Sequence, residues 1–559
     1  MNADPDSTQI WDVVVVGSGM GGSMAAAVLA DSGLSVLVIE SGTKNPKGRN
    51  RSSFAAKLKH KIFAEVQTDL DSERWPDPLL FRTTSSRRYN AIRPILGRVA
   101  GGSAAIYGAA LGRARRSDFE QDWQPSAWLA GAASALPNNW PLNFDEMVAR
   151  YGEVEKLLRV TGSPDPLDRD DNSDLRAAPP ISSNSAALFE RLRSNGRHPF
   201  RMHVAIDYRP GCNECQGELC HRQCKSTSFN RLLDPRIAGG KVALRMETHA
   251  ERIERDPGDI LRVRIRDNTG NKSAVSARRI VLAGGALNTP LLLRRSASLW
   301  ANDKVPEQVG AGLMFHFSDM LAVMEANDGP GNGGPLKTLA FRDHYVEGNM
   351  PLAECQSLGL AASPWMVGDY LEGEMLELGL GRIPLLSFAA NIAGRIAAKG
   401  FSNAYLFTAA LEDLPYLHNR VDPLGPSIVP GLDRIAVTYK APEELLVRAR
   451  RLRALLREAF APAQVRFLKR LGAPNLGHPM GTCRMGDDPA VSVVDPDGQV
   501  WGQPGIYVAD ASAFPSSLGI NPALTVAANA LRVAENIVGQ TVFNAEAAAQ
   551  IAVPAFDTH

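Results

Sequence analysis

The sequence lacks the features that would place it in a membrane or on a nucleic acid. Its best candidate for a membrane span, the apolar interval between residues 382 and 395, is well short of the roughly 20 residues that a bilayer requires. Basic and acidic residues number 61 and 60, and a net charge of +1 attracts neither nucleic acid nor an anionic surface. The amino terminus has acids and no apolar core, unlike a signal peptide. These absences predict a cytoplasmic protein with no integral membrane segment and no nucleic-acid partner.

Cysteine is also scarce, and its distribution excludes a disulfide framework for the whole chain. There are six cysteines, of which four lie in one short segment, at Cys212, Cys215, Cys220 and Cys224. Cys355 and Cys483 stand alone and are expected to be small buried residues. The dense segment fits an iron-sulfur cluster, which would give electrons a way out of the protein, or a zinc ion. A loop with free or locally paired thiols is the alternative, and the spacing leaves the three interpretations open.

The composition is that of a globular enzyme, with 44% hydrophobic and 22% charged residues. A chain of 559 residues is too long for one compact core, so two closely joined domains are expected. Residues 12–16 are continuous and β-branched and stop at glycine, which predicts a buried parallel strand. An alanine-rich helix over 20–31 and a second strand over 34–39 follow. The sequence therefore predicts an α/β fold that begins with a Rossmann-like βαβ unit.

The turn after the first strand carries the glycine pattern of a nucleotide site. Gly17 suits a tight turn, Gly19 lets the backbone approach a pyrophosphate, and Gly22 allows close packing of helix and strand. The phosphates would lie at the positive end of the helix. Glu40 follows the second strand, where its carboxylate can accept hydrogen bonds from ribose hydroxyls. This unit alone does not distinguish NAD from FAD.

Two further glycine-rich segments indicate that the chain returns to the cofactor. The segment GRVAGGSAAIYG from residue 97 avoids bulk, as backbone lying against a planar ring or a diphosphate must, so Gly101, Gly102 and Ser103 are candidate flavin contacts. A buried turn against a helix is the alternative. Residues 277–290 form a second short strand that ends in two glycines, including Gly284, before a helix near Pro290.

The carboxy-terminal segment contains the candidate chemistry. His478 lies in a loop flanked by glycines and not on a periodic apolar face, which favours a functional over a structural histidine. Asn521 directly precedes Pro522, where a long alanine-rich helix would begin, so its side chain can cap that helix or point into a pocket.

Four motifs occur in order along the chain: GSGMGG with Glu40, GRVAGGS, VLAGGALNTP, and the segment from GHPMGTCRMG to NPALT. Together they resemble the glucose-methanol-choline (GMC) oxidoreductases. VGAGLMFH, around His316, is a weaker match. The resemblance implies a discontinuous FAD-binding domain over 10–155, 235–315 and 470–545. A mixed sheet-plus-helix substrate domain would then span 156–234 and 316–469, with a cysteine-rich loop at 212–224.

In that family a hydride passes from a carbinol carbon to the flavin while a histidine takes the hydroxyl proton. The resemblance assigns the base to His478 and its partner to Asn521, which holds the substrate oxygen. Asp510 and Ala511 match positions that touch the ribityl and pyrophosphate region, and Gly284 a position near the adenine half. Asn521 and Pro522 also count among the expected cofactor contacts.

Two departures from the family pattern refine the prediction. Ile106 stands where members with covalent FAD have a histidine, which predicts non-covalent FAD. Tyr107 stands where many members have asparagine, and an aromatic residue at this place resembles the sugar-oxidising branches of the family. We therefore expect oxidation of a sugar, amino sugar or polyol alcohol, with O2 or an electron carrier as acceptor. A nicotinamide-dependent dehydrogenase, an oxidase of non-sugar alcohols, a lyase on the same scaffold and a non-catalytic electron-transfer subunit are the alternatives.

Overall fold

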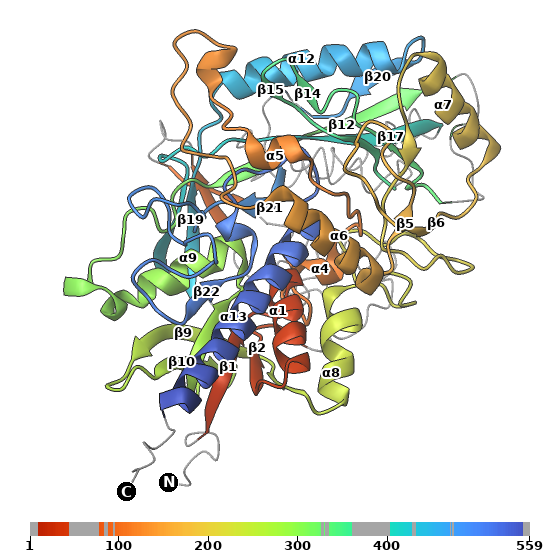
Figure 1. Ribbon diagram of the computed structural model, residues 1–559. Helices are drawn as coiled ribbons and strands as arrows, with labels where there is room; N and C mark the ends of the chain where they lie inside the picture. Colours follow the sequence, from red (N-terminus) through yellow and green to blue (C-terminus); the bar gives the residue numbers. More distant parts are fainter. Residues whose placement is uncertain are drawn as a thin grey trace, which may run out of the picture.

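The computed structural model of the protein describes residues 9–43, 78–82, 88–92, 96–325, 329, 335–359, 403–427, 432–469, 471 and 475–551. Two seven-stranded sheets dominate these residues, one at each end of the molecule, with helices between and over them (Figure 1). Among the described helices, none has the length and apolar character needed to cross a membrane. The apolar interval at 382–395 lies outside the described residues.

The first sheet has the strand order β8-β2-β1-β11-β10-β9, with β22 beside β11. Its strands are β1 (Ile10–Val16), β2 (Val36–Ile39), β8 (Val242–Arg245), β9 (Thr248–Arg255), β10 (Leu261–Asp267), β11 (Lys272–Leu282) and β22 (Ile506–Val508). The strands β8, β2, β1, β11 and β22 run parallel, and β9 and β10 add an antiparallel edge. The predicted α/β fold with a Rossmann-like unit is therefore confirmed.

Helix α1 (Met20–Asp31) begins four residues after β1 and packs against the carboxy-terminal helix α13 (Ala523–Ile551) (Figure 1). Most of α1 is buried, because small side chains such as Ala25 and Ala26 let it lie between the sheet and α13. The backbone of Gly21 approaches Ala509 so closely that a Cβ on this glycine would lie 1.7 Å from the Ala509 oxygen. The first and last helices of the described chain thus meet over the βαβ unit.

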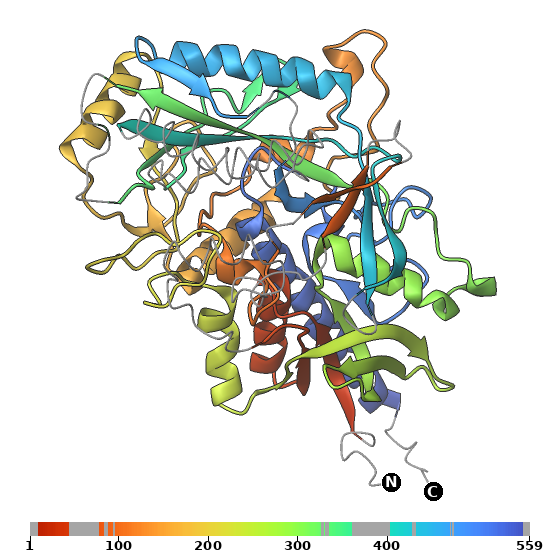
Figure 2. The ribbon, with the colours of Figure 1, turned by 180° about the vertical axis from the view of Figure 1, so that it is seen from behind.

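The second sheet has the order β20-β12-β17-β16-β13-β7, with β21 also paired to β12. Its strands are β7 (Phe200–Arg201), β12 (Met314–Met324), β13 (Leu339–Phe341), β16 (Cys355–Ser357), β17 (Ala404–Leu411), β20 (Gln464–Phe467) and β21 (Asn475–Met480). All these pairs are antiparallel. Helix α12 (Glu443–Ala459) lies across this sheet in both views (Figures 1 and 2).

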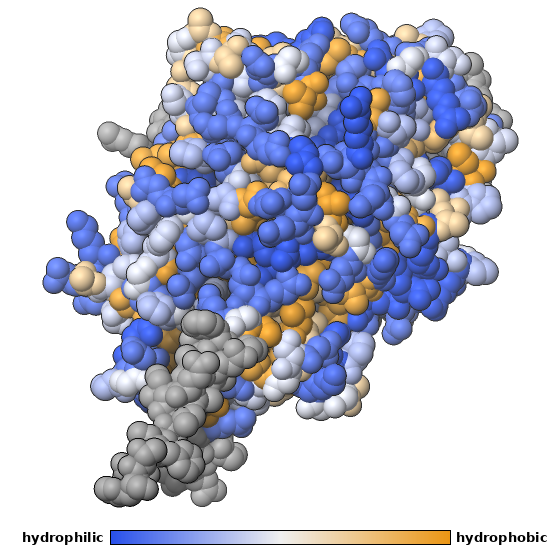
Figure 3. All heavy atoms as spheres, viewed as in Figure 1, coloured by the Kyte–Doolittle hydropathy of each residue, from blue (hydrophilic) through white to orange (hydrophobic). Residues whose placement is uncertain are grey.

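Smaller elements connect the two sheets. The strands are β3 (Leu79–Arg82), β4 (Asn90–Ile92), β5 (Thr161–Gly162), β6 (Arg176–Ala177), β14 (Val346–Glu347), β15 (Met350–Pro351), β18 (Arg420–Pro426) and β19 (Asp433–Thr438). The helices are α4 (Ser103–Ile106), α5 (Arg116–Glu120), α6 (Phe144–Leu158), α7 (Ser183–Ser194), α8 (Asp234–Ala238) and α9 (Gly285–Arg295), with short turns η2 to η6. The face in Figure 3 is mainly hydrophilic, with hydrophobic residues in small groups.

Helix α12 contains a buried ion pair that ties it to the sheet below. The Arg448 guanidinium, which has no exposed surface, donates to Glu444 one turn earlier and to the backbone oxygens of Pro351 and Glu412. Tyr416 donates a further hydrogen bond to Glu444. Removing only the cation would therefore leave a buried carboxylate without its countercharge.

Arg448→Met is expected to destabilise the protein by about 3–5 kcal/mol. The double variant Arg448→Met with Glu444→Leu should recover most of this loss, because both charges are then absent. Thermal unfolding of the two variants beside the unmodified protein measures the difference. Equal melting temperatures for the single and double variants would contradict this account of the pair.

Candidate active site

The glycines between β1 and α1 are required by close backbone packing. Gly17 has a φ of 102°, and a Cβ there would lie 2.4 Å from the Ala283 oxygen at the end of β11. A Cβ on Gly22 would lie 1.9 Å from the Gly17 oxygen. Both positions therefore have the packing roles that the sequence pattern predicts.

Gly19 differs from its neighbours because the space beside it is open. Among the described residues, no atom lies within 4 Å of a Cβ built on Gly19, and its φ of −63° would allow a side chain. Gly19 is the N-cap of α1, and the first turn of the helix has neither a side-chain cap nor an acid. The backbone N–H groups and the positive helix end therefore face an unfilled space suited to a diphosphate.

A buried hydrogen-bond network joins Glu40 to this turn. Glu40 accepts from Ser18 through both the backbone N–H, at 2.9 Å, and the hydroxyl, at 2.6 Å, and its other oxygen accepts from the Gly42 N–H at 2.7 Å. The Gly101 N–H donates in turn to the Ser18 hydroxyl at 2.9 Å. The Gly42-bonded oxygen also accepts from the Ser41 hydroxyl, at the long distance of 3.4 Å, and a ribose hydroxyl would take the place of this bond.

The predicted flavin loop lies directly against the nucleotide turn. Gly101 and Gly102 have φ values of 90° and 54°, and a Cβ on Gly102 would lie 3.2 Å from the Gly19 Cα. Ser103 begins α4, and its hydroxyl accepts from the Gly97 N–H at 3.1 Å. The structure thus brings Gly19, Glu40, Gly101 and Gly102 together from segments sixty residues apart in the chain.

Gly284 and Asp510 meet at the ends of β11 and β22. Asp510 accepts from the Gly285 N–H at 2.7 Å, the Thr289 hydroxyl at 2.6 Å and the Ser512 N–H at 2.8 Å. Burial raises the pKa of this carboxyl. The Asp510 side chain therefore fixes the starts of α9 and of the 511–513 turn.

His478 lies in β21 and is hydrogen bonded to a second histidine. Its Nδ1 lies 2.9 Å from Nδ1 of His316, which is fully buried in β12, and the two rings meet edge to face. The His316 Nε2 lies 2.9 Å from the Ser517 carbonyl oxygen and 3.0 Å from that of Leu518. Burial lowers the pKa of His316 to about 4, and burial together with the neighbouring His316 lowers the pKa of His478 to about 3. Both imidazoles are thus neutral at physiological pH.

Asn521 lies three residues beyond Leu518, so the same loop leads from the histidine pair to the start of α13. The Asn521 side chain is partly exposed, whereas Pro522 is buried. The Pro522 carbonyl accepts the first hydrogen bond of the helix, from the Val526 N–H at 2.9 Å. The predicted cap or pocket residue thus stands at a helix start, as the Asn-Pro pair indicates.

Comparison with known proteins identifies the family. Models of the GMC oxidoreductases match residues 12–318 with their amino-terminal part and 428–530 with their carboxy-terminal part. The chain is a GMC oxidoreductase. As a member of this family it is an FAD-dependent oxidoreductase, and the open space beside Gly19, the uncapped end of α1 and the Glu40 network fit the dinucleotide.

Several relatives of this GMC oxidoreductase act on sugar-like compounds, according to their names. It is 28% identical over 569 positions to paromamine 6'-oxidase of Streptomyces fradiae, which covers 96% of this chain and 93% of that protein. It is 29% identical over 555 positions to 6'''-hydroxyparomomycin C oxidase of Streptomyces lividus, covering 95% and 91%. Among solved structures, pyridoxine 4-oxidase matches with a TM-score of 0.58 and 20% identity over 94% of this chain and 99% of that chain, which shows a shared fold.

Tyr107 connects the flavin loop of the GMC oxidoreductase to the cysteine-rich loop. Its hydroxyl donates to the Ser226 oxygen at 2.6 Å, and its own carbonyl accepts from the Lys225 ammonium at 2.9 Å. The same ammonium donates to the carbonyls of Cys215 and Glu218, and the Gly217 N–H donates to Ile106. The cysteine-rich loop is therefore packed onto the segment that follows Ser103.

The predicted metal site is not supported. Although the four cysteines lie within the described residues, that part of the chain contains no group of three or more His, Cys, Asp or Glu side chains able to hold a metal ion. The thiols lie beside one another: Cys215 bonds to Cys220, and Cys224 interacts with Cys212 and Cys220. A hydrogen bond from Cys215 lowers the pKa of Cys220 to about 4, Cys224 donates to the Arg222 carbonyl, and all four residues are free thiols. Neither the iron-sulfur cluster nor the zinc ion is therefore supported by the described residues, and the loop with free thiols agrees with them.

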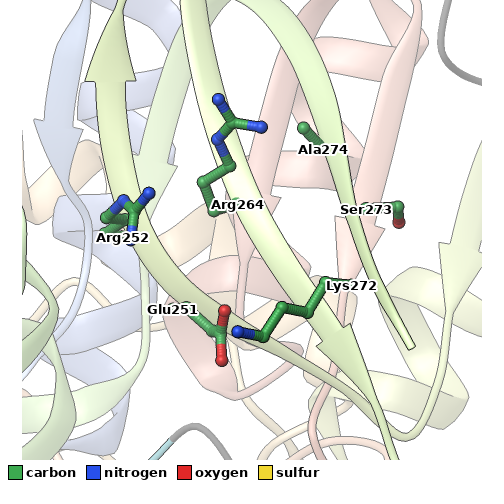
Figure 4. A pocket seen from close by; sticks show the side chains of 6 residues that line it. All are labelled: Glu251, Arg252, Arg264, Lys272, Ser273 and Ala274. Carbon is green, nitrogen blue, oxygen red and sulfur yellow. The ribbon is translucent and has the colours of Figure 1, made fainter. Parts of the chain in front are cut away.

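The pocket in Figure 4 is separate from the histidine pair. It lies on strands β9 to β11, and its lining residues are Glu251, Arg252, Arg264, Lys272, Ser273 and Ala274. Arg252 and Arg264 both donate to Glu254, at 2.6 and 2.7 Å. Because its guanidinium groups are already paired with an acid, this surface pocket offers no distinct chemistry.

Sequence reasoning missed the role of His316 and of Ser18. Ser18 lies inside the glycine motif but connects Glu40 to Gly101 through its hydroxyl. His316 stood within the weak family match VGAGLMFH, yet no local pattern indicates that it bonds a residue 162 positions later. Only the pairing of β12 with β21 brings the two histidines together.

Proposed function

We propose that this protein oxidises an alcohol carbon of a sugar, amino sugar or polyol to a carbonyl. Two relatives are named as oxidases of paromamine and of 6'''-hydroxyparomomycin C, and a third as a C-glycoside 3-oxidase, which supports a sugar-like substrate. The environment of His478 carries the proposal. The His478 imidazole is neutral and is hydrogen bonded at one nitrogen to His316, which in turn bonds to the loop before Asn521. A base that takes a hydroxyl proton must be in this neutral state.

In this proposal each site residue has one task. His478 takes the proton of the substrate hydroxyl, and the Asn521 amide holds the substrate oxygen without competing for that proton. FAD, when bound, supplies the two-electron acceptor for the carbinol hydrogen. The backbone around Gly17, Gly19 and Gly22 holds the diphosphate, Glu40 the ribose, and Gly101, Gly102, Ser103, Gly284, Ala511 and Pro522 border the cofactor.

The cofactor is proposed to be non-covalent, because the buried side chain of Ile106 has no atom that could bond the flavin. We assign residues 10–155, 235–315 and 470–545 to the FAD-binding domain and residues 156–234 and 316–469 to the substrate domain. We propose O2 or an electron carrier as the acceptor that reoxidises the flavin.

The pH dependence of the reaction follows from the pKa of His478. The base acts only when neutral, so activity is lost as pH falls through the pKa of about 3 and not near the ordinary value of 6.5. We expect the rate of flavin reduction at saturating substrate to stay level from about pH 8 to about pH 5. Stopped-flow measurements across this range test it, and a fall in rate centred near pH 6.5 would contradict the assigned state of His478.

Product analysis tests the proposed reaction. The purified flavoprotein is incubated in air with a panel of amino sugars, simple sugars, polyols and aliphatic alcohols, and the products are analysed by mass spectrometry and NMR. We expect a carbonyl product lacking two hydrogen atoms from at least one sugar-like compound. Fragmentation without oxidation would indicate a lyase instead, and oxidation only upon addition of a nicotinamide cofactor would reject the flavin mechanism.

A further inference from the structure

His316 is surrounded in a way that fixes which of its nitrogens carries a proton. Its Nε2 faces two backbone carbonyl oxygens, those of Ser517 and Leu518, and both can only accept hydrogen bonds. If Nε2 carried a lone pair instead of a hydrogen, three buried acceptors would face one another with no donor between them, and this arrangement would destabilise the fold. Nε2 must therefore carry the hydrogen.

The loop that presents these carbonyls is itself held in place. The Ser517 hydroxyl accepts from the Asp413 N–H at 2.7 Å, and the neighbouring Ser516 hydroxyl accepts from the Trp140 ring N–H at 3.3 Å. The Gly519 N–H donates to the Tyr345 hydroxyl at 3.2 Å. Because the loop is bonded on both sides of Leu518, the carbonyls cannot simply turn away from His316.

The proton on Nε2 determines the rest of the contact. Burial keeps His316 neutral, and a neutral imidazole has one N–H, so its Nδ1 is an acceptor. The group 2.9 Å away is Nδ1 of His478, which must then be the donor. A neutral His478 that donates through Nδ1 has its lone pair on Nε2.

We propose that His316 is a positioning residue that fixes His478 in the tautomer with hydrogen on Nδ1, leaving Nε2 as the nitrogen that takes the substrate proton. The inference rests on the proposed role of His478 as base. It gives His316 the part that a carboxylate has in a serine-protease triad, where an acceptor orients the imidazole and sets its tautomer. Here the acceptor is a neutral ring anchored by two carbonyls, so no additional charge is buried beside the base.

Two substitutions separate the two hydrogen-bonding functions of His316. In His316→Asn the amide oxygen can replace Nδ1 as acceptor for His478, whereas the bonds to the loop carbonyls are lost. In His316→Gln the amide N–H can replace Nε2 as donor to the loop, whereas the acceptor for His478 is lost. We expect His316→Gln to slow flavin reduction by about 10²-fold, and His316→Asn to slow it by only a few-fold.

The experiment uses the flavin-loaded full-length protein, with flavin content and melting temperature measured for every variant. If His316→Asn is slower than His316→Gln, His316 only anchors the loop and the proposal fails. His478→Ala is run in parallel. If that variant keeps full activity, the proposed function itself fails, whereas its collapse beside an unimpaired His316→Gln rejects only the role of His316.

The unmodified protein provides a second test that needs no variant. With ¹⁵N-labelled histidine, the long-range ¹H–¹⁵N spectrum should show His478 with a protonated, pyrrole-type Nδ1 and an unprotonated, pyridine-type Nε2, and His316 with the opposite pattern. The His316→Asn spectrum, in which one imidazole signal is missing, assigns the pair. A protonated Nε2 in His478 would overturn the proposal.

Discussion

His478→Ala is expected to slow substrate-dependent flavin reduction by about 10²–10⁴-fold, the usual contribution of a general base. The imidazole at position 478 is neutral and held by His316, and its removal leaves the hydroxyl proton without an acceptor. Flavin binding should be retained, because His478 is not among the residues assigned to hold the cofactor. Anaerobic stopped-flow spectroscopy at several substrate concentrations measures the rate.

His198→Ala is the matched control for this substitution. The His198 side chain is about half exposed, and its bond within the described part of the chain is to Asp343. We expect this variant to reduce its flavin at the unmodified rate. If both histidine variants keep full activity, or both lose their flavin, His478 does not act as the base.

Gly19→Val is expected to weaken FAD binding by at least about 10²-fold, since hydrogen bonds to a charged group contribute about 1.5–3 kcal/mol each and several are displaced. The backbone allows this side chain, because φ is −63° and no atom of the residues that the structure describes lies within 4 Å of the new Cβ. The methyl groups would instead occupy the space at the end of α1 that we assign to the diphosphate. Flavin absorbance of the purified variant and titration with FAD measure the effect.

Gly539→Val is the matched control for Gly19→Val, because it makes the same substitution at a position away from the proposed cofactor site. Gly539 also has no atom within 4 Å of an added Cβ, but it lies on the exposed surface of α13. Both variants should unfold at similar temperatures when stripped of FAD, and only Gly19→Val should purify without flavin. Normal flavin content in Gly19→Val would show that the dinucleotide does not lie against this turn.

The sequence predicted those parts of the fold that depend on local pattern. The first βαβ unit follows from a β-branched run, three glycines and a terminal acid that are near in the chain, so β1, α1 and β2 lie within two residues of their expected bounds. The return of the chain to the nucleotide site near Gly284 was predicted because a short apolar strand there also ends in glycines. Backbone packing admits only glycine at Gly17 and Gly22, and the φ of 80° at Gly285 favours glycine in the second place.

The features that sequence reasoning missed depend on contacts between distant segments. The bond between His316 and His478 requires β12 to pair with β21, and the buried Arg448 depends on carbonyls of Pro351 and Glu412. The sequence left the cysteine segment open between a metal site and free thiols. Its spacing resembles a ligand set, but the order of residues does not reveal that Cys215 bonds to Cys220 and that the Lys225 ammonium occupies the loop carbonyls.

The most direct test of the central claim is anaerobic titration of the purified flavoprotein with an amino sugar such as paromamine, followed by visible absorbance. We predict that the oxidised flavin spectrum bleaches without any nicotinamide, that the bleaching is far slower in His478→Ala, and that air or an added electron acceptor restores the colour. A protein that binds no flavin, or one whose flavin stays oxidised with every sugar and alcohol, would contradict the account.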